Sequence, residues 1–286
     1  MKMNGKFGIW ITVLLGGLLI SYAQQQPFSF VLLSDTQLGM YTGDKGFAQE
    51  TANFEFCVAA VNRLKPAFVV ILGDLVNKAG DPAQIKEYKR IARLINPAIP
   101  VYEAAGNHDV GNEPTEESLA LYRKTFGRDY YSFRAGPVYG IVLDSVLMHT
   151  PKNVPGACQE QQIWLQKELE KAKGSGLQHI VLFQHHPVFL QDPEEPDRYE
   201  NIPRAQRQVL LELLLQYGVH HVFAGHTHKN IAAQAGSIEI VATGPVGKPL
   251  GKDGSGIRVA AVTDSGMEHR YYEFGMMPER LAPLHK

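Results

Sequence analysis

The chain alternates between short apolar runs and longer segments whose apolar residues recur at helical spacing. Short, mainly apolar runs, typical of buried strands, occur at residues 28–33, 67–72, 99–104, 138–143, 179–183 and 219–224. Helical spacing occurs at residues 46–65, 82–96, 115–126, 159–173 and 203–217. Beyond residue 228, short runs separated by glycine-rich turns predict further strands at 231–235, 238–242, 257–263 and 270–274. The alternation of strands and helices predicts an α/β fold.

The first 23 residues have the pattern of an export signal. Lys2 and Lys6 precede an apolar stretch at residues 7–20, and Ser21-Tyr22-Ala23 supplies small residues for a cleavage site after Ala23. An uncleaved membrane anchor is the alternative, but the stretch is short for a spanning helix of ~20 residues. We therefore expect a periplasmic or secreted protein whose mature part, residues 24–286, has the length of one large α/β domain.

Composition narrows the classes of partner. A formal net charge of −1 gives no positive field for the nucleic acid backbone, so a nucleic acid scaffold role is excluded. No stable membrane insertion is expected once the signal is cleaved. Cys57 and Cys158 are predicted to be buried free thiols, although an oxidising compartment would also permit a disulfide.

Polar clusters follow five of the predicted strands. They are Asp35-Thr36-Gln37, Gly73-Asp74, Gly106-Asn107-His108-Asp109, His185-His186-Pro187 and Gly225-His226-Thr227-His228. A single cluster could be a polar turn or a buried structural histidine. Since ligands of α/β sheets bind outside the carboxyl ends of the strands, the five clusters together predict one shared site.

The residue types in these clusters favour a pair of divalent metal ions. Imidazole, carboxylate and amide donors without a thiolate suit Mn, Fe, Zn or Mg ions and argue against a cysteine-rich zinc site. The donors are too many for one tetrahedral ion, and Asp74 is the best candidate for a bridging carboxylate. Two such ions activate water and stabilise the oxygens of a reacting phosphate. His108 would protonate the leaving alcohol, and Asp109 would hold the His108 imidazole in one orientation.

In their order along residues 35–228, the five clusters resemble the blocks of the calcineurin-like metallophosphoesterases. The resemblance implies a four-layer α/β/β/α sandwich with a two-metal site at the strand ends. Carried over residue by residue, it implies that the first ion binds Asp35, Gln37, Asp74 and His228. It implies that the second ion binds Asp74, Asn107, His185 and His226, that His186 has a supporting role, and that His108 is the catalytic histidine.

One position departs from the usual family pattern. Most members have Asp-x-His in the first block, whereas Gln37 stands in the place of that histidine here. An amide oxygen is a weaker ligand than imidazole for a borderline metal, so the first site is expected to bind more weakly, to favour a harder ion or to be partly empty. The Asp-x-Gln variant is similar to a subgroup of serine/threonine-protein phosphatases within the family.

The sequence therefore predicts a hydrolase of phosphate monoesters, phosphoserine and phosphothreonine included, acting on a small molecule or a protein. Asn107, His108 and Arg207 are the candidate substrate-binding residues, with a helix-surface role open for Arg207. A phosphodiesterase acting on nucleotides or phospholipid head groups is one alternative. A non-catalytic binding scaffold is the other.

Export can be tested on the full chain with its own N-terminus in a Gram-negative host. We expect a mature protein that begins at Gln24 and appears in the periplasmic fraction or the medium, because signal peptidase cuts after a small residue. Intact-mass spectrometry gives the cleavage position. As a control, Leu15→Arg places a charge in the apolar stretch and should retain the precursor in the cell. Uncut protein in the membrane fraction would support the anchor instead.

Overall fold

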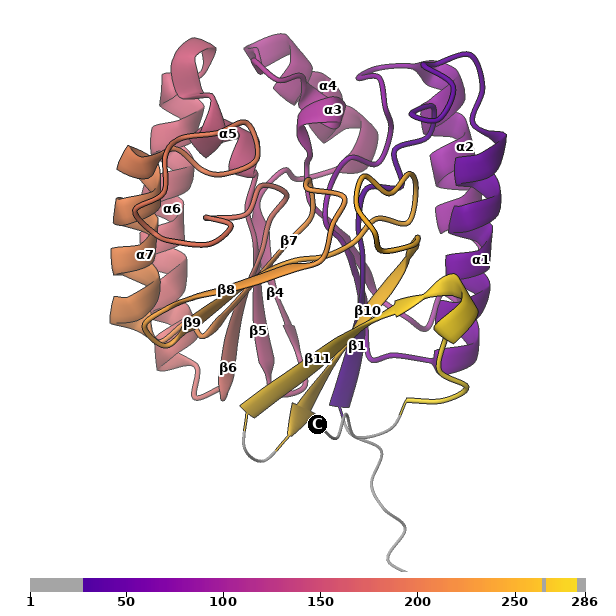
Figure 1. The fold of residues 1–286 in the computed structure, drawn as a ribbon. Helices are drawn as coiled ribbons and strands as arrows, with labels where there is room; N and C mark the ends of the chain where they lie inside the picture. Colours follow the sequence, from indigo (N-terminus) through magenta and orange to yellow (C-terminus); the bar gives the residue numbers. More distant parts are fainter. Residues whose placement is uncertain (1–27, 264–265, 282–286) are drawn as a thin grey trace, which may run out of the picture.

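The computed structural model describes residues 28–263 and 266–281, which form two sheets flanked by helices (Figure 1). The strand order of the first sheet is β11-β10-β1-β2-β3, with β1 at Phe28–Leu33, β2 at Val69–Ile71, β3 at Val101–Glu103, β10 at Gly256–Thr263 and β11 at Gly266–Glu273. The order of the second is β4-β5-β6-β7-β9-β8, with β4 at Tyr131–Ala135, β5 at Val138–Val142, β6 at His179–Phe183, β7 at His221–Ala224, β8 at Ile231–Ala235 and β9 at Ile238–Ala242. The proposed signal at residues 1–23 lies outside the described residues.

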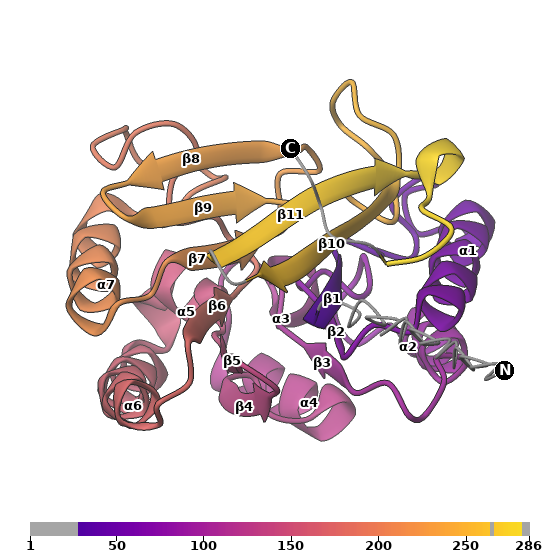
Figure 2. The same ribbon diagram turned by 90° about the horizontal axis from the view of Figure 1, so that it is seen from below.

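The helices cover the outer faces of the two sheets. Helices α1 (Ala48–Leu64) and α2 (Pro82–Ala92) lie on the first sheet, and α6 (Pro155–Gly174) and α7 (Arg204–Tyr217) lie on the second (Figure 2). Helices α3 (Asn107–Val110) and α4 (Glu116–Phe126) follow β3, and the short helix α5 (Ser145–His149) follows β5. The predicted four-layer α/β/β/α sandwich is confirmed.

The apolar cluster between the sheets contains several aromatic side chains that contact one another. Phe68 is fully buried there and stacks on Phe30 with ring centroids 4.6 Å apart. The edges of the Phe133 and Phe183 rings meet it from the second sheet at 5.2 and 6.4 Å. Such tilted and stacked pairs add specific geometry to the burial of apolar area, and they fix how one sheet sits on the other.

Local sequence signals set most element boundaries, with small differences at some ends. Asp81 caps α2 by accepting hydrogen bonds from the backbone of the first turn, and Pro82 occupies the first helical position. Helix α2 ends at Ala92, earlier than the expected 96. Helix α6 begins at Pro155 rather than at 159, because proline is well accommodated in a first turn. Strand β11 begins before the expected residue 270.

The parallel strands bring the polar clusters to one edge of the sandwich. Strands β1, β2 and β3 are mutually parallel, as are β5, β6, β7 and β9, so each group ends on the same side. The cysteines Cys57 and Cys158 are buried and free, as predicted. Within the described part of the chain, no helix combines the length and the hydropathy that crossing a membrane requires.

The aromatic layer between the sheets should dominate stability. Phe68→Ala should lower the free energy of unfolding by about 3–5 kcal/mol, because a fully buried ring is lost and the space cannot be refilled. Urea unfolding followed by circular dichroism measures the change. Phe56→Ala is the matched control, since Phe56 is 45% exposed on α1. Equal losses in the two variants would contradict this account of the core.

Candidate metal centre

The backbone adopts a conformation that costs energy at five of the predicted ligand positions. Asp35, Gln37, Asp74, His226 and His228 all have positive φ angles, of 50°, 37°, 51°, 70° and 53°. For residues with a side chain this left-handed region is sparsely populated, and such strain concentrates at functional sites. Each position lies within four residues of the end of β1, β2 or β7.

Glycines allow these turns to approach one another closely. A Cβ atom at Gly106 would lie 2.2 Å from the backbone nitrogen of Asp74, and one at Gly225 would lie 2.0 Å from the Ser34 hydroxyl oxygen. Only glycine fits at either position without displacing the neighbouring segment. The two glycines therefore permit the end of β3 to meet the end of β2, and the end of β7 to meet the end of β1.

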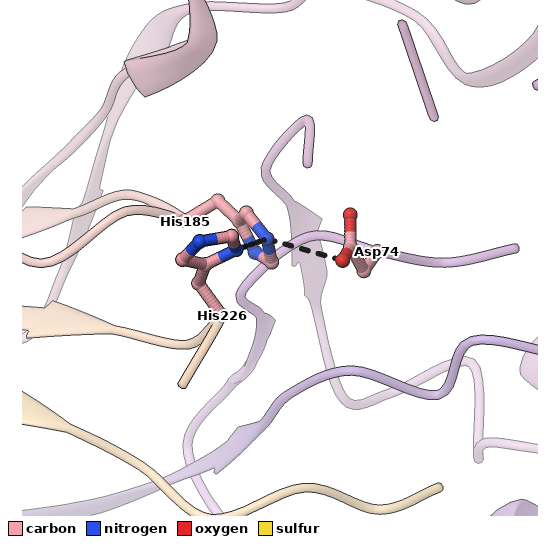
Figure 3. Close-up of side chains that lie close together, drawn as sticks. All are labelled: Asp74, His185 and His226. Atoms are coloured by element: carbon pink, nitrogen blue, oxygen red, sulfur yellow. Dashed lines mark hydrogen bonds and ion pairs between the residues drawn. The ribbon is translucent and has the colours of Figure 1, made fainter. Parts of the chain in front are cut away.

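The four residues predicted to bind the second ion converge on one point. The Nε2 atom of His185 lies 3.2 Å from Asp74 Oδ2, 3.1 Å from Asn107 Oδ1 and 3.2 Å from His226 Nδ1. Among the residues that the structure describes, Asp74, His185 and His226 form one of two groups with the spacing needed to hold a metal ion (Figure 3). The side chains come from the ends of four different strands, so tertiary structure alone brings them together.

Asp74 also belongs to the second group, together with Asp35 and His228. The His228 Nε2 atom lies 3.4 Å from Asp35 Oδ1. Because Asp74 is common to both groups, it is placed where a bridging carboxylate would be. This arrangement agrees with the predicted role of Asp74, and the ligand roles themselves stay predictions.

The amide of Gln37, which is also predicted to bind the first ion, has only one of its two polar atoms satisfied. Its amide nitrogen donates a hydrogen bond to Asn77 Oδ1 at 3.1 Å, while its buried Oε1 atom has no hydrogen-bond partner. A buried acceptor is rarely left unsatisfied in a native protein, and a metal ion bound to the oxygen is one explanation for such an atom. The chemistry of the donor set therefore fits a divalent ion at Gln37 as well as at the imidazoles.

Each histidine of the predicted ligand set has one ring nitrogen occupied by a backbone carbonyl. His185 Nδ1 lies 2.7 Å from Leu72 O, His228 Nδ1 lies 2.6 Å from Lys248 O, and His226 Nε2 lies 3.0 Å from Tyr199 O. Bonds of this kind fix the tautomer and the ring orientation of metal-binding histidines. The other nitrogen of each ring is thereby left free to face the centre.

Burial and mutual charge determine the protonation of the centre. Burial by itself would raise the pKa of Asp74, but the adjacent His185 holds that pKa below its usual range. For His185, burial opposes protonation and the Asp74 carboxylate outweighs it, raising the pKa to about 9. Burial lowers the pKa of His226 to about 3, so this ring is neutral at pH 7. A metal ion bound beside Asp74 would displace the proton from His185, because a histidine binds metal in its neutral form.

The structure corrects the predicted partner of His108. The His108 Nδ1 atom lies 2.7 Å from the backbone carbonyl of Asn77, and not beside Asp109. The Asp109 carboxylate instead accepts hydrogen bonds from the backbone nitrogens of Leu75 and Gly106, both at 2.9 Å. The Asp109 carboxylate therefore fixes the loop that carries Asp74 and does not hydrogen-bond to the His108 imidazole.

Arg207 does not reach the site either. Its side chain is fully buried, and its guanidinium donates to the backbone carbonyls of Ile202, Pro193 and Glu195 at 2.7–3.1 Å. It therefore anchors the loop before α7, and the predicted contact with substrate and the helix-surface role both fail for the same reason. His186 is buried beside His226, with ring centroids 4.3 Å apart, in agreement with a supporting role.

Sequence reasoning missed Tyr199 and Asn77. Both contribute backbone carbonyls to histidines of the site, and Tyr199 also places its hydroxyl 2.9 Å from Asn107 Nδ2. Every residue has a backbone carbonyl, so the residue type does not indicate which carbonyl accepts a hydrogen bond from a histidine. The exposed tyrosine in an otherwise acidic loop was the one signal that could have indicated this residue.

The chain is similar to known proteins over most of its length. The family model for calcineurin-like phosphoesterases matches residues 28–230. The serine/threonine-protein phosphatase CPPED1 of Mus musculus is 37% identical over 261 residues, covering 86% of this chain and 84% of the relative. The protein of the same name from Homo sapiens is 36% identical over 270 residues, covering 89% and 86%.

A solved structure agrees on the fold. A dimetal phosphatase from Danio rerio superposes with a TM-score of 0.60 at 16% identity, covering 86% of this chain and 96% of that one. At this identity the likeness concerns the arrangement of the sheets and helices only.

The sharing of Asp74 by both groups has a measurable consequence. Asp74→Asn should reduce the Mn²⁺ bound per chain from two ions to one or none, because a neutral amide cannot bridge two cations. Metal analysis after reconstitution and desalting measures the stoichiometry. Glu212→Gln, the same change on the exposed face of α7, is the control and should leave binding intact. Retention of two ions by Asp74→Asn would contradict the bridging position.

Proposed function

This chain belongs to the calcineurin-like phosphoesterase family and is a phosphate-ester hydrolase, and from that premise we propose that it is an exported phosphomonoesterase acting on phosphoserine and phosphothreonine. The observation that carries the proposal is the pair of donor groups joined by Asp74. The serine/threonine-protein phosphatase name of the relatives supports the choice of substrate. The N-terminal pattern at residues 1–23 supports export.

Two divalent ions bound to the donor groups would neutralise phosphate charge and make water a nucleophile at neutral pH. The chain supplies the geometry for them. Asp35 and Asp74 are held within the sandwich at 0% and 1% exposure, so their charges act through little water. The donor set of oxygen and imidazole nitrogen suits Mn, Fe, Zn or Mg, and Gln37 favours the harder ions at the first site.

His108 is suited to give a proton to the leaving alcohol. It is half-buried, its backbone nitrogen donates to Asp74 Oδ1 at 2.8 Å, and the Asn77 carbonyl fixes its Nδ1. With Nδ1 held in this way, Nε2 is the nitrogen that can carry the transferable proton.

A panel of paired substrates tests the substrate class. The protein, reconstituted with Mn²⁺, should hydrolyse phosphoserine peptides and p-nitrophenyl phosphate and should turn over bis-p-nitrophenyl phosphate much more slowly. A preference for the diester would replace the proposal with the phosphodiesterase alternative. Bound metal without turnover of either class would favour the non-catalytic scaffold.

The same panel measures the part played by His108. His108→Ala should slow hydrolysis of phosphoserine by ~10²–10⁴-fold, because an alkoxide leaves poorly without a proton. The loss should be smaller for p-nitrophenyl phosphate, whose leaving group needs little protonation. Metal content should be unchanged, since Nδ1 is bound to a carbonyl and the ring is not in either donor group. His220→Ala, on an exposed histidine, is the control. Equal losses on the two substrates would contradict the acid role.

A further inference from the structure

The loop between β6 and α7 extends to the centre and presents Tyr199 there. The Tyr199 side chain is 52% exposed, and its ring lies 4.8 Å from the ring of His226. Two different parts of this residue contact two different members of the second donor group, the backbone carbonyl at His226 and the hydroxyl at Asn107. No other residue described in the structure hydrogen-bonds to both of these side chains except His185, which itself belongs to the group.

The carbonyl contact determines which nitrogen of His226 is available. His226 Nε2 lies 3.0 Å from Tyr199 O, and a carbonyl can only accept, so Nε2 carries the hydrogen. The Nδ1 atom then has a lone pair and faces His185 Nε2 at 3.2 Å. Tyr199 therefore selects the tautomer of His226 that a metal ion requires.

The hydroxyl contact determines which end of the Asn107 amide faces inward. Asn107 Nδ2 donates to Tyr199 Oη at 2.9 Å and to Asn112 Oδ1 at 2.8 Å. Both amide hydrogens are thereby used on the outer side, and Oδ1 is left 3.1 Å from His185 Nε2. If the amide turned over, its nitrogen would face the other donors and would repel a cation.

The loop that carries Tyr199 is held in place by hydrogen bonds from two buried side chains, Arg207 and Asn201. The buried guanidinium of Arg207 donates to carbonyls at Pro193 and Glu195, at 2.7 and 2.9 Å. The fully buried Asn201 donates to the Glu195 carboxylate at 2.6 Å and accepts from the backbone nitrogen of Arg198 at 2.9 Å. These bonds fix the loop on both sides of Tyr199 and give a charged, buried residue of α7 a part in shaping the centre.

We propose that Tyr199 is a positioning residue that sets the orientation of Asn107 and His226, and with it the affinity of the second metal site alone. The inference rests on the proposed two-metal centre. Among the described hydrogen bonds, Tyr199 contacts no member of the first group, Asp74 included. The first site should therefore be insensitive to changes at Tyr199.

The test is Tyr199→Phe, which removes the hydroxyl and keeps both the ring and the backbone carbonyl. Calorimetric titration with Mn²⁺ should show one of two sites weakened by roughly tenfold, at the lower end of what loss of a ligand-orienting partner costs. Activity should fall at limiting Mn²⁺ and recover at saturating Mn²⁺. Unchanged affinity at both sites would overturn the proposal.

The control is Tyr217→Phe, which removes a hydroxyl that is hydrogen-bonded to Glu170 at 3.3 Å at the far end of α7. It should leave both sites unchanged. To identify the affected site, both tyrosine changes are repeated in a Gln37→Leu background, where the first site has lost a predicted ligand. Weakening of the remaining tight site by Tyr199→Phe supports the proposal, and weakening of the Gln37-dependent site contradicts it.

Failure of the inference and failure of the proposed function are separable in these measurements. Metal binding is read by calorimetry and needs no substrate. If the unaltered protein binds Mn²⁺ at two sites but hydrolyses no phosphate ester, the proposed function fails while the role of Tyr199 can still be measured. If it hydrolyses phosphomonoesters and Tyr199→Phe binds Mn²⁺ normally, only the inference fails.

Discussion

The structure depends on one unfavourable arrangement, the burial of two carboxylates just beyond the ends of β1 and β2. Asp35 and Asp74 lie at the ends of neighbouring parallel strands, and their partners at ion-pair distance in the described structure are histidines, with no lysine or arginine among them. Buried carboxylates are costly unless they are paired or bind a cation. The free energy gained by burying the aromatic layer and the inner faces of the helices offsets this cost. A bound cation would relieve it, which favours metal binding at these carboxylates.

Loops from opposite sides of the sandwich complete the centre with backbone atoms. The loop after β9 offers the Lys248 carbonyl to His228, and the loop after β6 offers the Tyr199 carbonyl to His226. The loop after β2 offers the Asn77 carbonyl to His108. Carbonyls held by a rigid loop orient imidazoles without introducing a further negative charge beside the metal ligands. The orientation of His108 and of the three histidines predicted to bind metal therefore follows from the same kind of contact.

Much of the fold and of the donor set could be predicted because it depends on local pattern. The runs that became β1 and β6 were visible as apolar stretches, and Asp81 with Pro82 gave the start of α2. The polar residues after each strand could be grouped, because parallel strands end on the same side. The role expected of Asp109 was wrong because a neighbour in sequence was taken for a neighbour in space, and the role expected of Arg207 was wrong because the fold buries its side chain. Asp109 is satisfied by backbone nitrogens of the preceding loop, and Arg207 is turned inward by the carbonyls around it.

The sequence by itself determined most of the strands, the polar clusters that follow them, the family and the chemical type of the donors. Hydrophobic periodicity and residue identity, on which these predictions depend, are both properties of the chain. The tertiary structure decided which nitrogen of each histidine faces the centre, that Gln37 keeps a buried oxygen without a partner, and that Tyr199 meets Asn107 and His226. These features depend on the positions of backbone carbonyls in loops that follow different strands. Every residue type carries the same carbonyl, so only the folded arrangement can show where each one points.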